Sequence, residues 1–182
     1  MNRRAGIQIM KYTKGSILSI LFLFYLYILL KVILFKFGSV SLAYLWRQLQ
    51  STLEYPEYMQ YGLRRANFTP FESIQENIHR IANYNDQINL FGNIAIFLPC
   101  GILVGLWAKR TAISFLGAAT LSFGLSLALE CSQFVFAMGS FDVDDLILNG
   151  LGGLLGWGML FVVRRERRLP QQSVCSPDKQ PA

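Results

Sequence analysis

The chain has 182 residues, of which 53% are hydrophobic and only 15% charged, and its mean hydropathy is +0.36. Soluble domains average about 45–50% apolar and about 25% charged residues, so this composition excludes an ordinary soluble domain and indicates a membrane protein. The net charge of +6 comes from basic residues that lie beside apolar runs rather than in one patch, which argues against nucleic-acid binding.

Four apolar segments are long enough to cross a bilayer, so the sequence predicts an all-α integral membrane bundle of four transmembrane helices. The predicted spans are 15–37, 88–107, 112–136 and 146–163. In the long loop 38–87, apolar residues at helical spacing around Trp46 predict an amphipathic helix that ends at Pro56. Ser73 and Glu76 predict a capping box for a second short helix that runs to about Tyr84.

Basic residues cluster before the first span, at Lys109 and Arg110, and after the fourth span. These segments hold 11 basic and 2 acidic residues, whereas the other two loops hold 4 basic and 8 acidic residues. By the positive-inside rule, both termini are predicted to be cytoplasmic and the long loop to be outside. We therefore predict a basic cytoplasmic segment, 1–14, a transmembrane domain, 15–163, and a basic, disordered cytoplasmic tail, 164–182.

Polar residues interrupt the last three spans near their predicted outer ends, where lipid disfavours them. At about 1.5 Å per residue, Asn93, Glu130 and Asn149 fall at a common depth of roughly 5–10 Å below the outer boundary. We therefore predict an outward-opening polar recess that binds a ligand. Its predicted lining residues are Asn89, Asn93, Glu130, Gln133, Asp142, Asp144, Asp145 and Asn149.

Glu130 is the candidate functional residue, because a carboxylate within a span requires protonation, a partner or a cation. It could act as a general acid or base. Glu130, Asp144 and Asp145 would suit Ca²⁺ or Mg²⁺, but no histidine or bridging spacing supports such a site, and we predict no metal or other cofactor. Alternatively, the polar residues only join helices by hydrogen bonds.

The loop segment that contains Asn67, Pro70 and Phe71 has two interpretations. It is either a linker that lies along the membrane or a lid over the predicted recess. Glycines in the fourth span, with Gly152 and Gly156 in Gly-x-x-x-Gly spacing, predict close helix packing.

The order and spacing of four motifs resemble those of the VanZ-like membrane proteins, over roughly Arg64 to Val163. The motifs are Asn67-Phe68-Thr69-Pro70-Phe71 with Ile74, Asn89 to Gly101, Glu130 to Gln133, and Phe141 to Asp145 with Asn149, Gly150, Gly152 and Gly153. The resemblance implies a multi-pass protein of the bacterial plasma membrane and a role in low-level resistance to the glycopeptide teicoplanin. Many relatives have an arginine shortly before the element that begins at Phe141, and this chain has none at 137–140.

We therefore expect a multi-pass membrane protein that binds an envelope-related ligand, either a glycopeptide antibiotic or a lipid-linked wall precursor. The first alternative is a membrane enzyme that acts on a lipid-linked substrate with Glu130 as general acid or base. The second alternative is a non-catalytic membrane scaffold. The sequence leaves the oligomeric state and any enzymatic activity open.

Overall fold

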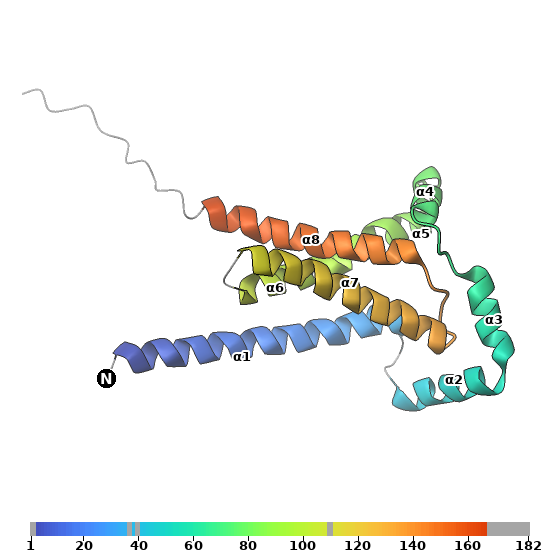
Figure 1. The fold of residues 1–182 in the computed structure, drawn as a ribbon, viewed down its shortest axis with the longest axis horizontal. Coiled ribbons are helices and arrows are strands. Elements are labelled where there is room, and N and C mark those ends of the chain that lie inside the picture. Colours follow the sequence, from blue (N-terminus) through green and yellow to red (C-terminus); the bar gives the residue numbers. More distant parts are fainter. Residues whose placement is uncertain (1–2, 36–37, 39–40, 109–110, 167–182) are drawn as a thin grey trace, which may run out of the picture.

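The computed structural model describes residues 3–35, 38, 41–108 and 111–166, and it confirms the predicted all-α fold (Figure 1). Its elements in chain order are α1 (Arg3–Leu29), η1 (Leu30–Leu34), α2 (Leu42–Glu54), α3 (Pro56–Arg65), α4 (Glu72–His79), α5 (Tyr84–Gln87), η2 (Ile88–Gly92), α6 (Asn93–Trp107), α7 (Thr111–Val135) and α8 (Val143–Glu166). Within these residues, the β-type pairing is one isolated parallel bridge between Asn67 and Asp142. The pair Lys109 and Arg110 and the tail beyond residue 166 lie outside the described residues.

Four helical segments of 22 to 25 residues are apolar enough to cross a membrane, as predicted. They are Thr13–Leu34, Tyr84–Trp107, Thr111–Val135 and Val143–Glu166. The fourth begins before the predicted boundary at residue 146, because Asp144 and Asp145 occupy the first turn of α8. Acidic side chains are favourable there, since the first turn has unpaired N–H groups and the positive end of the helix dipole.

Glycines allow α6 and α8 to pack more extensively than any other pair of helices. A Cβ atom at Gly152 would overlap the carbonyl oxygen of Ile94, and one at Gly156 would overlap that of Leu98. The predicted Gly-x-x-x-Gly spacing therefore lies at a helix contact, where the absence of side chains lets the two backbones approach.

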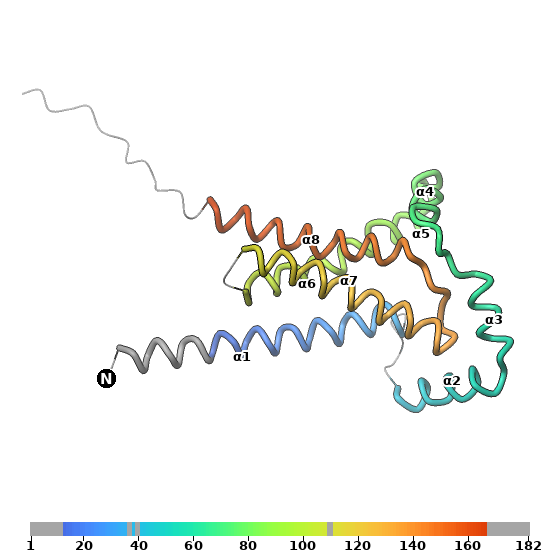
Figure 2. The backbone as a smooth tube through the Cα atoms, viewed as in Figure 1, coloured from blue at the N-terminus to red at the C-terminus, as the bar shows by residue number. Residues whose placement is uncertain are grey.

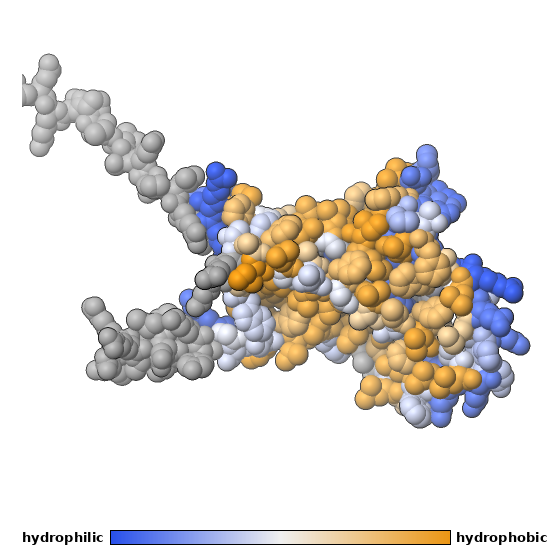
Figure 3. Space-filling view, viewed as in Figure 1, coloured by the Kyte–Doolittle hydropathy of each residue, from blue (hydrophilic) through white to orange (hydrophobic). Residues whose placement is uncertain are grey.

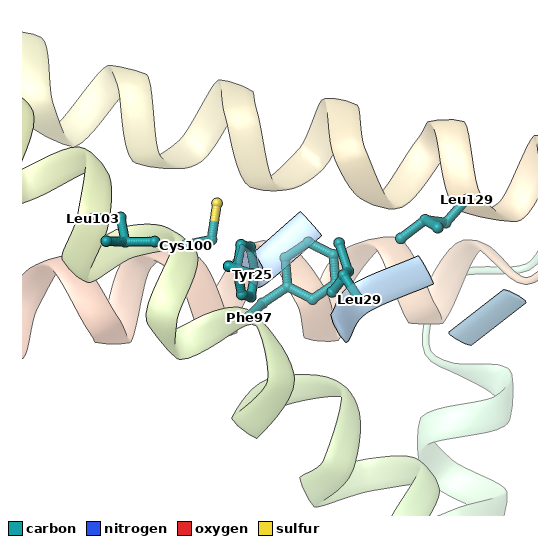
Figure 4. Packing of buried hydrophobic residues seen from close by; sticks show 6 residues of the cluster. All are labelled: Tyr25, Leu29, Phe97, Cys100, Leu103 and Leu129. Carbon is teal, nitrogen blue, oxygen red and sulfur yellow. The ribbon is translucent and has the colours of Figure 1, made fainter. Parts of the chain in front are cut away.

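A small apolar core joins α1 to α6 and α7 (Figure 4). Phe97 and Cys100 of α6 are fully buried, and they pack with Tyr25 and Leu29 of α1. The Tyr25 hydroxyl donates a hydrogen bond to the carbonyl of Ile96 at 3.1 Å, so its polar end has a partner inside the bundle.

Large apolar side chains cover the outside of the long helices, as expected for a surface in contact with lipid. Leu23, Phe24, Leu116 and Met159 are each more than half exposed. Apolar residues gather over the middle of the bundle, and hydrophilic residues gather toward its two ends (Figure 3). The beginning of the described α1 and the end of α8 lie at one of these ends, and α2 to α5 lie at the other (Figure 2).

The helices of the long loop differ in part from the prediction. The first is confirmed as α2, where the Ser41 side chain caps the helix by accepting the N–H of Tyr44. Pro56 follows the end of α2 but also occupies the first turn of α3, a helix that was not predicted. Proline is favourable at this position because its ring fixes a helical φ and no intrahelical N–H bond is lost.

The second predicted loop helix is present as α4, but its predicted start was wrong. It begins at Glu72, and its N-cap residue is Phe71, which has a left-handed φ of 70° and makes no side-chain cap. Ser73 lies inside the helix and donates its hydroxyl proton elsewhere. The helix also ends at His79, before the predicted end near Tyr84.

Candidate functional site

One face of α7 carries small and polar residues at four-residue spacing. Ser114, Ala118, Ser122, Ser126 and Glu130 are all buried, because this spacing places them on one side of the helix. We call this set the α7 row. It was not predicted, although the regular spacing in the sequence was the available signal.

Hydrogen bonds join the α7 row to α8. The Asn149 side-chain amide donates to the Ser126 hydroxyl at 2.8 Å, and the Trp157 indole N–H donates to the Ser114 hydroxyl at 2.7 Å. Buried polar groups in a bilayer find their partners on neighbouring helices, so these contacts fix α7 against α8. Asn149, predicted to line the recess, is therefore engaged between two helices.

Glu130 lies at the end of the α7 row nearest α2 to α5, and it is only 2% exposed. Its Oε2 accepts the backbone N–H of Asp142 at 3.0 Å, and its carboxyl group contacts that of Asp145. Asp145 also accepts a hydrogen bond from the Asn93 side chain at 2.6 Å. The structure thus brings together polar residues of α6, α7 and α8, and the α8 residue is Asp145 rather than Asn149, whose depth matched in the sequence.

Asp142 holds the loop segment that precedes α4. Its two carboxylate oxygens accept hydrogen bonds from the Asn67 amide at 2.9 Å and from the Ser73 hydroxyl at 2.6 Å. The backbone bridge adds two further bonds, from the Asn67 N–H to the Phe141 carbonyl and from the Val143 N–H to the Asn67 carbonyl. One side chain and one short bridge therefore bind residues about 75 positions apart in the sequence.

Asp144 holds the other end of the same segment. It is 1% exposed, and its oxygens accept the backbone N–H groups of Phe71 at 2.6 Å and Ile74 at 3.1 Å. These are N–H groups at the start of α4, so a carboxylate from α8 caps that helix in place of the predicted local capping box. The local sequence around Ser73 could not reveal this cap.

The segment 67–74, which we call the docked segment, is thus held against the start of α8 by Asp142 and Asp144. Phe68 also stacks on Phe141, with ring centroids 5.5 Å apart. Pro70 is exposed near the tip. The predicted lid residues Asn67 and Phe71 make direct hydrogen bonds to predicted site residues.

The carboxylate groups show no metal-site arrangement within the described part of the chain, where no group of three or more His, Cys, Asp or Glu side chains could hold a metal ion. The sequence suggested Glu130, Asp144 and Asp145 as possible ligands for Ca²⁺ or Mg²⁺. In the structure, both oxygens of Asp144 accept backbone N–H groups. Glu130 and Asp145 contact each other, and a carboxyl pair inside a bundle requires a shared proton or a nearby positive charge.

An open pocket of about 580 Å³ lies between α3, η2 and the end of α7. It is lined by Tyr58, Tyr61, Gly62, Arg65, Asn89, Gln133, Phe134, Ala137, Met138, Gly139 and Ser140. We call it the α3 pocket. Of the residues predicted to line a recess, Asn89 and Gln133 line this pocket, whereas the carboxylates make the hydrogen bonds described above.

The residues that α3 contributes to the pocket were missed by the sequence analysis. Tyr58, Tyr61 and Arg65 are three and four residues apart, which places them on one face of a helix. This signal was overlooked because Pro56 was interpreted only as the end of the preceding helix. Gln133 helps to fix the opposite wall, where its side chain donates to the carbonyl of Ile33 at 2.9 Å.

Four long apolar helices, with hydrogen bonds between polar side chains of α7 and α8, define a multi-pass helical membrane protein. A family model described as VanZ/LLP1 matches residues 22–164, so the chain belongs to the VanZ/LLP1 family. Over 96 residues the chain is 36% identical to Protein VanZ of Enterococcus faecium. This match covers 53% of the chain and 52% of the relative, so the chain spans about half the length of the curated relative it matches. No solved structure matches the chain.

Proposed function

We propose that this protein binds an envelope-related ligand in the α3 pocket, on the outer face of the bacterial plasma membrane. The ligand is a glycopeptide antibiotic or a lipid-linked wall precursor, and binding contributes to resistance to glycopeptides such as teicoplanin. The observation that carries the proposal is an open pocket lined by the amides of Asn89 and Gln133 and by the Arg65 guanidinium. The outward orientation rests on the positive-inside rule.

The chemistry of the pocket supports this proposal. Amide groups both donate and accept hydrogen bonds, and tyrosine rings offer flat apolar faces with a polar tip. Such a mixture suits the sugar and peptide groups of both candidate ligands. The buried contacts of Glu130 and Asp145 lie one turn from Gln133 and stabilise the helix ends that form the pocket wall.

Binding by the full-length protein in lipid nanodiscs tests the proposal, with teicoplanin and a lipid-linked wall precursor as separate probes. Asn89 is exposed in the pocket, so Asn89→Ala removes a ligand contact without disturbing a buried one. We expect this variant to weaken binding by about three- to tenfold, the effect of losing one hydrogen bond. Asn85→Ala, at an exposed residue outside the pocket lining, is the matched control and should bind normally.

Antibiotic susceptibility of cells that express the same variants provides the second measurement. Asn89→Ala should lower resistance, and Asn85→Ala should not, at equal amounts of membrane protein. Failure of both probes to bind, or equal behaviour of the two variants, would contradict the proposal. Loss of stability without a separable activity in Asn93 and Glu130 variants would instead favour the scaffold alternative.

A membrane enzyme is the second candidate, favoured by the contact between the carboxyl groups of Glu130 and Asp145. A carboxyl pair of this kind can supply a general acid or base to a substrate in the adjacent pocket. Turnover of a lipid-linked substrate by the wild-type protein, abolished in Glu130→Gln at unchanged stability, would support the enzyme. Binding without turnover would support the first candidate.

A further inference from the structure

The α3 pocket adjoins a second, apolar cavity of about 230 Å³, and Phe134 is part of both linings. The second cavity is lined only by apolar residues and a cysteine, namely Leu63, Phe68, Cys131, Phe134, Val135 and Phe141. We call it the apolar slot. Helices α3 and α7 contribute to both cavities, because α3 supplies Leu63 to the slot and Arg65 to the pocket and α7 supplies Phe134 to both.

The α3 pocket has a positive charge that the described residues do not neutralise. Among the described residues, its lining contains one cation, Arg65, and no carboxylate. Glu57, which precedes Tyr58 in α3, is exposed and lies outside the lining, and Asp142 binds Asn67 and Ser73. A pocket of this composition favours an anionic ligand.

Contacts with Tyr61 restrain Arg65 in the lining of the pocket. One guanidinium nitrogen donates to the Tyr61 hydroxyl at 3.2 Å, and the group lies 5.5 Å from the centre of the Tyr61 ring. Arginine has five N–H donors in a planar fork, so this contact leaves further donors for the paired oxygens of a phosphate. Because Tyr61 restrains the side chain, less conformational entropy is lost when an anion binds.

The apolar slot includes exposed residues of α7. Cys131 and Val135 are exposed on this helix, and both belong to the last two turns of a membrane-spanning segment. The slot and the pocket thus meet where apolar span and polar loop meet, which is the depth of lipid phosphate groups. Tyr58 and Tyr61 suit the same depth.

We propose that the two cavities bind one amphiphile, a lipid whose phosphate or pyrophosphate group contacts Arg65 and whose hydrocarbon chain passes Phe134 into the apolar slot. This inference rests on the proposed function, and it names the chemical class of ligand that the site takes. A free anion would leave the slot empty, and an uncharged lipid would leave the guanidinium unpaired, so the combined geometry favours the amphiphile.

Three probes test the inference with the full-length protein in nanodiscs of zwitterionic lipid: farnesyl pyrophosphate, inorganic pyrophosphate and farnesol. We expect farnesyl pyrophosphate to bind at least about tenfold more tightly than either other probe, because only it has both parts. Equal binding of inorganic pyrophosphate would refute the role of the slot. Equal binding of farnesol would refute the role of the anion.

Two variants separate the contributions, and a third is the control. Arg65→Gln should weaken farnesyl pyrophosphate binding by about tenfold or more, whereas Arg64→Gln, the same change one residue away and outside the lining, should have an effect below about twofold. Val135→Trp fills the slot and should abolish the advantage of farnesyl pyrophosphate over inorganic pyrophosphate. Equal effects of the two arginine variants would overturn the inference.

The outcomes also distinguish this inference from the proposed function. Teicoplanin binding that depends on Asn89, together with no binding of farnesyl pyrophosphate, would preserve the proposed function and refute the lipid phosphate. A different result would be binding of farnesyl pyrophosphate that depends on Arg65, while the Arg65 and Asn89 variants leave antibiotic susceptibility unchanged. This result would support the inference and refute the role in resistance.

Discussion

Asp144→Asn is expected to release the docked segment locally while the transmembrane bundle stays folded. Asp144 is 1% exposed and accepts two backbone N–H groups, from Phe71 at 2.6 Å and from Ile74 at 3.1 Å. Asparagine keeps one acceptor oxygen, but its NH₂ group replaces the other oxygen and faces an N–H donor. The variant therefore loses one charge-assisted bond, weakens the second and leaves a buried donor without a partner.

The magnitude follows from these contacts. A hydrogen bond to a charged group contributes about 1.5–3 kcal/mol, so we expect the free energy of opening the segment to fall by about 2–3 kcal/mol. This corresponds to an increase of about 30- to 150-fold in the population of the open form. Hydrogen exchange of the full-length protein in nanodiscs should show the increase at the amides of Phe71 and Ile74, and not in α6 or α8.

Glu76→Gln is the matched control, because Glu76 lies on the surface of α4, the helix that Asp144 caps. Its ion pair with Arg80 is 3.9 Å long, and both side chains are more than 60% exposed. Such pairs contribute at most about 1 kcal/mol, so exchange at Phe71 should change little. Exchange in Asp144→Asn within about twofold of wild type, or an equal rise throughout the bundle, would refute the local anchoring by Asp144.

Three further predictions concern the bundle, each measured as thermal or chemical unfolding in detergent. Gly152→Ala should destabilise by about 1–3 kcal/mol, because the new methyl group meets the backbone of α6, whereas Gly150→Ala faces open space and should have little effect. Equal effects would contradict the close packing. Glu130→Gln should preserve the free energy of unfolding within about 1 kcal/mol, since its amide oxygen can still accept the Asp142 N–H. Glu130→Ala should lower it by about 2–4 kcal/mol, because that N–H is left unsatisfied. A large loss in the glutamine variant would show that the charge itself is required. Trp157→Phe should lower the free energy of unfolding by about 0.5–1.5 kcal/mol, because the hydrogen bond to Ser114 of the α7 row is lost. In a protein that already carries Ser114→Ala, the same change should have no effect.

The carboxylates at the start of α8 make hydrogen bonds within the protein. Counting charges along the chain gave a predicted outer face with 8 acidic and 4 basic residues. In the structure, Asp142 and Asp144 are engaged with the docked segment and Asp145 with Asn93. Among the described residues, the lining of the α3 pocket has one arginine and no acid, so the local charge at the proposed site is opposite to the predicted sum over that face.

Some features of this protein are determined by the sequence alone, because they depend on properties that sum along the chain. Hydropathy over about 20 residues identifies a span wherever it packs, so the four transmembrane helices were predicted with boundary errors of a few residues. Helical spacing identified α2, and the order of the motifs identified the family. The depth of a residue within a span follows from the same counting, which is why Asn93, Glu130 and Asn149 were expected to be close. In the structure, Asp145 bonds to Asn93, whereas Asn149 bonds to Ser126.

The tertiary structure alone decided which polar groups pair and which remain open to a ligand. Asp144 caps a helix whose first residue lies about 70 positions earlier, and Gln133 bonds to the carbonyl of Ile33, 100 positions away. No local pattern encodes such partners, since a carboxylate or an amide can bind any suitably placed donor or acceptor. The same reason applies to the α3 pocket, where Arg65 and Asn89 face one cavity only because α3 folds back beside the end of α7.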